Sequence, residues 1–392
     1  MAYSSGRVIH DADSHIFESL RFYRGYADAS MSDRLEADLL ALFFDASARE
    51  SFEEAVARHD DPEVRATAGD EIMQRKLWDA LGAFRGEDRS KALDYLGFSS
   101  QIVFDSFFRL LMRTYESGDD LDLLYGAAGA YMRAITDFCA GDPRLLPAGY
   151  VPLADPARSV AFVGEAIESG CAALTMSADC PRSHAPSHVD LEPVWAQAAE
   201  AGVPVIYHLG SGRTPSDTFK NNGRPQDKGF AGGDGTFTSL EYLGSPLPVI
   251  ETLNCLIVDG VLDRNPGLRI GVLEFGSTWL PGYLRFLDGG YAAYSRIEGR
   301  LQKLEFKLSE YVQRQVRIAP YHFEDTGWLI REAGPEVAMF SSDYPHKEGG
   351  RDPIAKFEKS MDEYGISDAD RDRFYAKNFE DLLSGRFSLA GT

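Results

Sequence analysis

The amino-acid sequence predicts an α/β protein folded as a closed (β/α)8 TIM barrel. Eight short apolar segments with the length of strands recur along the chain, and most are followed by a stretch with helical periodicity. Three of these segments end in histidine or aspartate, as expected where the carboxyl ends of barrel strands surround a site. The predicted strands lie near Ile9, Val103, Ala148, Leu174, Ile206, Ile270, Val316 and Ala338.

Length and composition are those of a globular enzyme. The chain has 392 residues, of which 44% are hydrophobic and 26% are charged. We interpret residues 1–392 as a single barrel domain that carries a helical insertion and a long Gly-rich loop. The formal net charge of -21 argues against nucleic acid or an anionic membrane as a partner. The net charge carries no information about the substrate itself.

The predicted compartment is the cytoplasm. The N-terminal residues lack the long apolar segment of a signal peptide, and no apolar run approaches the roughly 18 to 20 residues needed to span a bilayer. The four cysteines have no C-x-x-C spacing, which favours reduced, buried thiols over disulfides.

The first predicted strand carries two candidate metal ligands. Val8 and Ile9 lead directly into the sequence His-Asp-Ala-Asp-Ser-His. Side chains alternate along a strand, so Asp13 and His15 point to the same side. An aspartate and a histidine at the end of a strand are suitable ligands for a divalent metal ion.

A helical insertion is predicted after this strand, over about residues 19–95. The region is rich in Ala, Asp, Glu, Arg and Leu, and Leu35, Leu39 and Leu42 have helical spacing. Most of its charges are expected on a solvated face. We expect the insertion to lie over one end of the barrel.

Alternating strands and helices follow from Gly97 onward. Asp155-Pro156 begins one helix, Gly202 ends another, and Ser367 with Asp370 forms a capping box for the last. The predicted helices cover about residues 121–139, 156–170, 191–201, 248–262, 325–333 and 368–383.

A Gly-rich stretch separates the fifth and sixth predicted strands, at about residues 210–245. It includes Gly-Phe-Ala-Gly-Gly-Asp-Gly at residues 229–235. Loops of this length inside a compact domain are usually functional or mobile, so we interpret the stretch as a lid over the site. A disordered excursion without function is the alternative.

Two further candidate ligands end other strands. His208 follows the apolar run Val-Pro-Val-Ile-Tyr, and Asp343 ends the strand that begins near Val337. The first and eighth strands of a closed barrel are neighbours, which brings Asp343 beside Asp13 and His15, whereas His208 approaches from the opposite side. Taken singly, each could be a packed, capping or turn residue. Together they predict a site for one divalent cation, Zn²⁺ first and Mn²⁺ as the alternative.

Three motifs resemble the amidohydrolase-related group of the amidohydrolase superfamily. They are Asp-Ala-Asp-Ser-His-Ile-Phe-Glu at residues 11–18, Val-Ile-Tyr-His-Leu-Gly-Ser-Gly at 205–212 and Phe-Ser-Ser-Asp-Tyr-Pro-His at 340–346. This branch includes aminocarboxymuconate-semialdehyde decarboxylase, γ-resorcylate decarboxylase and carboxyvanillate decarboxylase. The resemblance covers residues 8–384 apart from the insertion and the Gly-rich stretch, and the ordered set of motifs is specific for the family.

The resemblance implies a metal-dependent barrel that acts on a small organic acid, commonly by non-oxidative loss of CO₂. Asp13, His15, His208 and Asp343 match the family's metal ligands. Glu18 matches an acidic residue that lies near the metal or against substrate in relatives, with structural capping as the alternative. Relatives often form dimers, so a homodimer is expected.

One departure from the family concerns the sixth strand. Many relatives carry a histidine after it that serves as acid or base, but the matching residue here is Phe275. Glu274 takes over proton transfer if burial raises its pKa, and His346 is the other candidate. A histidine in a surface turn is the alternative interpretation of His346.

Three functions follow from these observations. The first is non-oxidative decarboxylation of an aromatic or unsaturated acid, and the second is metal-dependent hydrolysis of an ester, lactone or amide. Ligand binding without catalysis is the third, suggested by the missing sixth-strand histidine. Candidates for clamping or stacking on an aromatic acid, each of which could equally be a packing or surface residue, are Arg109, Arg213, Trp279 and Tyr344.

Overall fold

Seven parallel strands form the main sheet in a computed structural model that describes residues 2–42, 46–67, 69, 71–210, 212–213, 217–225, 230–232 and 235–384. Their order, β1-β2-β3-β4-β5-β8-β9, follows the chain. Each strand coincides with a predicted one, so the predicted α/β barrel is confirmed. The strands are β1 His10–His15, β2 Ser100–Phe104, β3 Leu145–Tyr150, β4 Ala173–Met176, β5 Val205–His208, β8 Ile270–Leu273 and β9 Val316–Ala319.

The eighth predicted strand, residues 337–343, together with Tyr344 forms a closing segment between β9 and β1 that has no regular ladder. One isolated bridge joins this closing segment to Ile318 of β9, and another joins Tyr344 to Ser14 of β1. The N–H of Phe340 donates instead to the carbonyl of Phe374 at 2.8 Å. Pairing with the neighbouring strands is therefore interrupted, because part of the segment's hydrogen bonding goes to the C-terminal helices.

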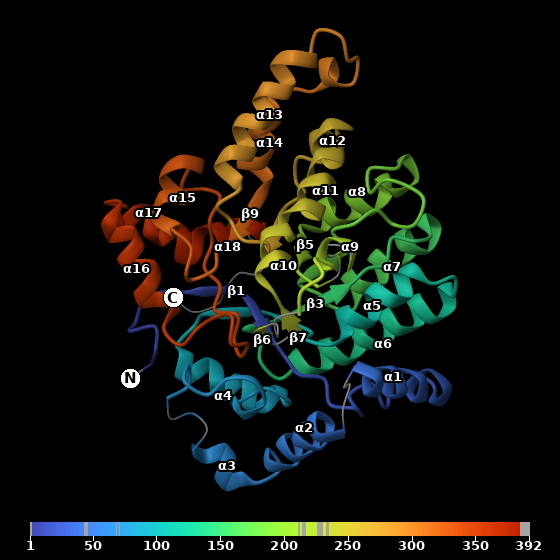
Figure 1. Cartoon of the computed structure of the whole chain (residues 1–392), viewed down its shortest axis with the longest axis vertical. Coiled ribbons are helices and arrows are strands. Elements are labelled where there is room, and N and C mark those ends of the chain that lie inside the picture. Colours follow the sequence, from blue (N-terminus) through green and yellow to red (C-terminus); the bar gives the residue numbers. More distant parts are fainter. Residues whose placement is uncertain are drawn as a thin grey trace.

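Helices follow the strands and surround the barrel (Figure 1). α7 (Pro156–Glu168) begins at Asp155, whose side chain accepts a hydrogen bond from the N–H of Arg158 at 3.1 Å, as predicted. α8 (Glu192–Ala201) ends at Gly202, which has a φ of 64°. The other helices around the barrel are α5 Phe108–Ser117, α6 Leu121–Cys139, α11 Pro246–Val258, α12 Val261–Arg264, α13 Leu280–Tyr294, α14 Leu308–Gln315, α15 Thr326–Ala333 and α16 Pro353–Glu363.

The final predicted helix consists of three pieces rather than one. A π-helical turn over Arg373–Lys377 separates α17 (Asp368–Asp372) from α18 (Asn378–Leu382). The hydroxyl of Ser367 accepts from the N–H of Asp370 at 3.2 Å, which confirms the predicted cap. The π-helical turn contains the carbonyl that accepts a hydrogen bond from the closing segment.

The region between β1 and β2 is helical, as predicted, and Figure 1 shows its helices gathered on one side of the molecule. The N–H of Phe17 donates to the carbonyl of Ala83 at 2.8 Å, and the N–H of Leu77 donates to the carbonyl of Pro345 at 2.7 Å. The insertion therefore contacts the loops that carry the predicted ligands. Its helices are α1 Ala29–Leu42, α2 Ala46–Arg58, α3 Pro62–Thr67 and α4 Gly86–Leu96.

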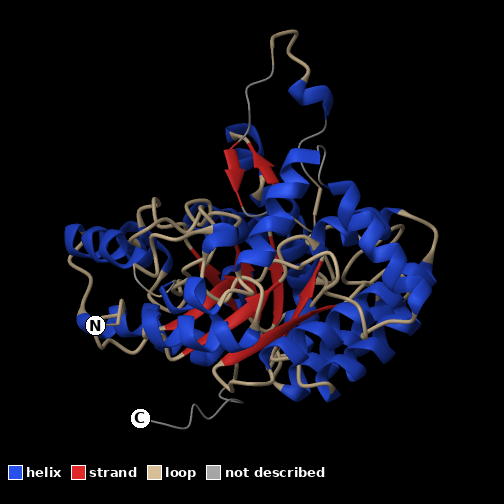
Figure 2. Ribbon diagram, turned by 90° about the horizontal axis from the view of Figure 1, so that it is seen from below, coloured by secondary structure: helices blue, strands red, loops and turns tan. Residues whose placement is uncertain are grey.

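The Gly-rich stretch contains more regular structure than the sequence predicts. Its described residues form α9 (Asp217–Lys220), the antiparallel hairpin of β6 (Phe230–Gly232) and β7 (Gly235–Phe237), and α10 (Ser239–Gly244). Figure 2 shows this hairpin standing apart from the main sheet. The predicted lid role stays a prediction, and residues 211, 214–216, 226–229 and 233–234 of the stretch lie outside the described residues.

The barrel interior is filled by apolar side chains. Small and branched residues from successive strands form one buried cluster there, which includes Ala12, Ile102, Phe104, Leu146, Ala148, Ile206, Leu273, Ala319 and Met339. The barrel is therefore a packed core rather than a pore, and polar side chains are left to gather at its mouth.

All four cysteines are free thiols, as predicted. Cys139 and Cys171 are buried, whereas Cys180 is exposed and Cys255 is partly exposed, so the expected burial holds for two of them. None of the helices in the described ranges has the length and apolarity needed to cross a bilayer.

Candidate metal centre

β1 ends in the two side chains predicted as the first metal ligands. Asp13 and His15 are fully buried, and Nε2 of His15 lies 3.0 Å from Oδ1 of Asp13. Nδ1 of His15 lies 2.6 Å from the carbonyl oxygen of Asp105, which follows β2. A hydrogen bond from Nδ1 to that carbonyl fixes the ring and leaves Nε2 directed at Asp13.

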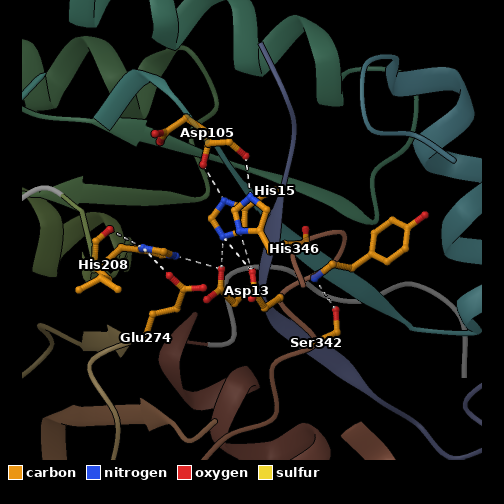
Figure 3. A network of polar contacts seen from close by, with 12 residues as sticks. Asp13, His15, Asp105, His208, Glu274, Ser342 and His346 are labelled. Atoms are coloured by element: carbon orange, nitrogen blue, oxygen red, sulfur yellow. Dashed lines mark hydrogen bonds and ion pairs between the residues drawn. The ribbon is translucent and has the colours of Figure 1, made fainter. Parts of the chain in front are cut away.

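The other two predicted ligands reach the same point from distant strands. Nε2 of His208, the last residue of β5, lies 3.2 Å from the same Oδ1 of Asp13. Oδ1 of Asp343 lies 3.5 Å from Nε2 of His15. Figure 3 shows Asp13, His15 and His208 pointing toward one another. The structure thus brings all four predicted ligands together.

Glu274 and His346, the two candidates for proton transfer, also belong to this cluster. Oε2 of Glu274 is 3.8 Å from Nδ1 of His208, and Nδ1 of His346 is 3.0 Å from Oδ1 of Asp343. The rings of His346 and His15 are stacked with their centroids 3.9 Å apart. Two groups have ligand atoms within 4.8 Å of one another, namely Asp13, His15, His208 and Glu274, and His15, Glu274, Asp343 and His346.

Two of these acidic residues have a strained backbone. φ is 61° for Glu274 and 47° for Asp343, which is the left-handed region that non-glycine residues rarely adopt. Such a conformation costs about 1–3 kcal/mol and persists where the surrounding structure enforces it, typically at functional sites. At both positions the chain turns away from the barrel, and the strained residue directs its carboxylate into the cluster.

Arg109 lies behind the two histidines and is almost fully buried. Its Nε donates to the carboxylate of Asp105 at 3.0 Å, and its Nη2 donates to the carbonyl of the same residue at 2.6 Å. Its Nη1 donates to the carbonyl of Leu209 at 3.0 Å and contacts the ring of His208. These contacts hold the segments that carry His15 and His208, and substrate binding by Arg109 stays a prediction.

Glu18 lies beside the loop that precedes α5. Its carboxylate accepts hydrogen bonds from the N–H groups of Ser106, Phe107 and Phe108 at 3.1, 3.1 and 2.9 Å. Burial and repulsion from Asp105 raise the pKa of Glu18 to about 7, although these N–H groups oppose the shift. The contacts fit the capping interpretation of Glu18, and its catalytic role stays a prediction.

Asp11 is a structurally important residue that sequence reasoning missed. Its carboxylate accepts hydrogen bonds from the N–H and the hydroxyl of Ser342 at 2.7 and 2.5 Å, and from the side-chain amide of Gln101 at 2.7 Å. Because Ser342 precedes Asp343, these bonds place a ligand beside β1. Burial raises the pKa of Asp11 to about 7 against these hydrogen bonds. The Asp-x-Asp-x-His pattern was the available signal.

Burial and mutual interaction shift the pKa values of Asp13, His15 and His208. Burial alone would raise the pKa of Asp13, but the imidazoles of His208 and His15 hold it below its ordinary value. Burial lowers the pKa of both histidines, with a further lowering of His15 by His346 and of His208 by Arg109. Ionised carboxylate and neutral imidazole are the forms in which these residues bind metals.

The donor set fits a divalent cation. Oδ2 of Asp13 is buried and has no hydrogen-bond partner among the described residues, which is costly unless a cation binds there. Asp13, Glu274 and Asp343 line a small cavity with a volume of about 10 Å³, which is enough for one ion or one water molecule. Imidazoles combined with carboxylates suit Zn²⁺ or Mn²⁺.

The remaining candidates for substrate binding lie outside this cluster. Tyr344 is fully buried, and its hydroxyl donates to the carbonyl of Leu81 at 2.8 Å. Trp279 precedes α13, and its Nε1–H donates to the carbonyl of Gly276 at 2.9 Å. Arg213 has a side chain that is 52% exposed and lines a separate cavity. Binding of substrate by these three residues stays a prediction.

That separate cavity has a volume of about 730 Å³ and lies beside the ends of β3, β4 and β5. Its lining includes Arg113, Arg182, Arg213 and Glu116. Oε1 of Glu116 accepts a hydrogen bond from the hydroxyl of Tyr150 at 3.2 Å. Burial raises the pKa of Glu116 to about 7, although Tyr150 and Arg182 oppose the shift.

The chain is thus a parallel α/β barrel with a buried His/Asp/Glu cluster at its strand ends that could hold a metal ion. The sequence matches the amidohydrolase family over residues 11–384, and the chain belongs to this family. The resemblance seen in the three motifs is thereby confirmed. A search of curated proteins gave no match.

The fold is similar to solved structures of the amidohydrolase superfamily. An amidohydrolase from Mycobacterium avium subsp. paratuberculosis K-10 is 21% identical with a TM-score of 0.71, over 96% of this chain and 99% of that chain. The 5-carboxyvanillate decarboxylase of Novosphingobium aromaticivorans DSM 12444, complexed with manganese and 4-hydroxy-3-methoxy-5-nitrobenzoic acid, is 18% identical with a TM-score of 0.62, over 98% of each chain. A 2,6-dihydroxybenzoate decarboxylase complexed with 2,6-dihydroxybenzoate is 16% identical with a TM-score of 0.59, over 96% and 99% of the two chains. At these low sequence identities, the structural similarity is evidence for the fold alone.

Removal of His208 tests the metal centre. Loss of a partner outside the ligand set usually weakens metal binding roughly 10- to 100-fold, so loss of a ligand in His208→Ala should weaken Zn²⁺ and Mn²⁺ binding at least that much. Metal content after dialysis, measured by mass spectrometry, should fall while the circular dichroism spectrum is unchanged. His188→Ala, at a histidine with a 42% exposed side chain, is the matched control. Full metal retention by His208→Ala would contradict the site.

Glu116 should make the protein less stable as pH rises. The pKa of its carboxyl is about 7 in the folded chain against an ordinary value of 4.5. The folded state therefore binds more protons between these values, and the free energy of unfolding falls as pH rises through them. In Glu116→Gln the free energy of unfolding should decrease with rising pH by up to about 3 kcal/mol less than in the wild type. Urea unfolding at several pH values measures it, and parallel curves for the two proteins would refute the prediction.

Proposed function

We propose that the protein is a divalent-metal-dependent enzyme that removes CO₂ without oxidation from a small aromatic or unsaturated carboxylic acid. The observation that carries this proposal is that Asp13, His15 and His208 converge at one buried point, with Asp343 in contact with His15 beside it. Family membership supports a metal-dependent reaction. Structurally similar proteins include decarboxylases of 2,6-dihydroxybenzoate and 5-carboxyvanillate, the second complexed with manganese. Zn²⁺ or Mn²⁺ is the proposed cofactor.

The proposed reaction sets one requirement on the protein. A divalent cation in this site would polarise the carboxylate and a neighbouring oxygen of the substrate. When the carbon–carbon bond breaks, its electron pair stays on the ring or alkene carbon, and CO₂ leaves. That carbon then takes a proton, so a proton donor must lie on the wall of the cavity that faces it.

Glu274 is the proposed proton donor. It lines the small cavity together with Asp13 and Asp343. His346 has both ring nitrogens engaged, with Nδ1 3.0 Å from Oδ1 of Asp343 and Nε2 2.7 Å from the hydroxyl of Ser106. These contacts suit His346 to holding Asp343 in place. Glu274 precedes the position at which relatives carry the sixth-strand histidine and would replace its function.

Hydrolysis of an ester, lactone or amide is the second candidate function. The observation that favours it is the same carboxylate of Glu274, because a base beside a divalent cation can activate water for attack on a carbonyl. The two reactions differ in their products, so a direct product assay distinguishes them.

The test uses purified protein loaded with Zn²⁺ or Mn²⁺. We expect CO₂ release from hydroxylated aromatic acids, beginning with 2,6-dihydroxybenzoate, measured together with the decarboxylated product by chromatography. Acid release from a panel of lactones and esters, without CO₂ from any acid, would favour the hydrolase. Saturable binding with neither product would favour a non-catalytic binding protein.

Variants at Glu274 complete this test. Glu274→Gln should retain metal and lower kcat by about 100-fold or more, the usual contribution of a general acid. Glu363→Gln, at a residue with a 59% exposed side chain, should leave kcat unchanged. An unchanged kcat in Glu274→Gln would exclude Glu274 as the donor.

A further inference from the structure

Glu274, the proposed proton donor, lies in a turn whose backbone departs twice from ordinary geometry. φ is 61° for Glu274 and 66° for Gly276, and both values fall in the left-handed region. Glycine adopts this region without strain, whereas glutamate does so only where the surrounding structure enforces it. Specific contacts must therefore hold this turn in place.

Glu324 binds the turn from the loop after β9. It is buried, and its Oε1 accepts hydrogen bonds from the N–H groups of Ser277 at 2.8 Å and Thr278 at 3.2 Å. Its Oε2 accepts from the hydroxyl of Ser277 at 3.1 Å and from the N–H of Tyr321 at 2.8 Å. One carboxylate therefore joins the loop after β8 to the loop after β9.

Tyr321 binds Glu274 itself. The residue is 8% exposed, and its hydroxyl donates to the backbone carbonyl of Glu274 at 2.7 Å. Its ring stacks on the ring of Phe323 with the centroids 5.0 Å apart, and the ring centroid of Tyr242, from α10, lies 5.9 Å away. Tyr321 and Glu274 also line the same small cavity. The hydroxyl therefore fixes the backbone of a residue whose side chain borders that cavity.

Capping of α13 is the purely structural alternative for Glu324. A capping side chain accepts hydrogen bonds from N–H groups in the first turn of a helix. The N–H groups that Glu324 binds belong instead to Ser277 and Thr278, which precede α13. A Cβ atom at Gly276 would lie only 3.3 Å from Oε1 of Glu324, so this carboxylate is packed against the turn. These contacts therefore act on the turn that contains Glu274.

We propose that Tyr321 and Glu324 are positioning residues that hold Glu274 in its strained conformation and so direct its carboxylate at the metal cavity. The proposal rests on the proposed function, in which Glu274 is the proton donor. In the structure this carboxylate lies beside His208 (Figure 3). Proton transfer requires the donor to be within hydrogen-bond reach of the acceptor, and relaxation of the turn would move the carboxylate away.

Paired substitutions at Glu274 test this constraint without any substrate. Glu274→Ala and Glu274→Gly both lack the carboxylate, but only alanine is strained at a positive φ, so the glycine variant should have the higher urea midpoint. Adding Tyr321→Phe should shrink this difference by roughly half or more, because the turn can then relax. Tyr125 is also 8% exposed, and its hydroxyl donates to the carbonyl of Asp155 at 3.0 Å. Tyr125→Phe is therefore the matched control and should leave the difference unchanged.

The rate of CO₂ release tests whether this positioning acts through Glu274. Tyr321→Phe should lower kcat roughly 10- to 100-fold at a nearly unchanged KM, the loss expected for a misplaced catalytic group. In the Glu274→Gln background the same substitution should lower kcat no further, since the group that it positions is gone. Should Tyr321→Phe fail to fold, Glu324→Gln gives the same comparisons.

Two results would overturn the inference. One is a difference between the glycine and alanine variants that Tyr321→Phe leaves unchanged, and the other is an equal loss of kcat with and without Glu274, which indicates a general structural role. The outcome is separable from that of the proposed function. CO₂ release by the wild type without the coupling in stability overturns this inference alone, whereas that coupling in a protein that releases no CO₂ overturns decarboxylation and supports the positioning of Glu274.

Discussion

The hydrogen bonds between Asp11 and Ser342 are a central constraint on the candidate metal centre. The closing segment pairs with its neighbouring strands through isolated bridges, and the N–H of His15 donates to the carbonyl of Tyr344 at 2.7 Å. The carboxylate of Asp11 adds side-chain contacts next to Asp343 by accepting the N–H and the hydroxyl of Ser342. Asp343 follows directly, and its strained φ of 47° carries its carboxylate to His15. The contacts that close the barrel therefore also position the candidate ligand Asp343.

A second set of contacts connects the insertion to the same loops. Arg89 of α4 donates to the carbonyls of Gly82 and His15, and the hydroxyl of Tyr344 donates to Leu81. The insertion thus braces both sides of the metal centre, at the end of β1 and at the end of the closing segment. A region outside the barrel therefore contributes support to the site.

The sequence was sufficient for the barrel and for the meeting of the four candidate ligands because both follow from local patterns. Apolar runs mark strands, and a polar residue at a strand end marks the barrel mouth. The irregular closing segment and the π-helical turn escaped prediction, since the hydrogen bond that joins them, from Phe340 to Phe374, links segments distant in sequence. The structural roles of Asp11 and Arg109 escaped it for the same reason, as their partners are distant in sequence.

Anomalous X-ray diffraction from crystals grown with Mn²⁺ or Zn²⁺ tests directly whether this cluster binds a metal ion. We expect one anomalous peak at the barrel mouth, at about 2.0–2.2 Å from oxygen and nitrogen atoms of Asp13, His15, His208 and Asp343. A fully loaded protein with its metal elsewhere, or with no peak among these four side chains, would contradict it.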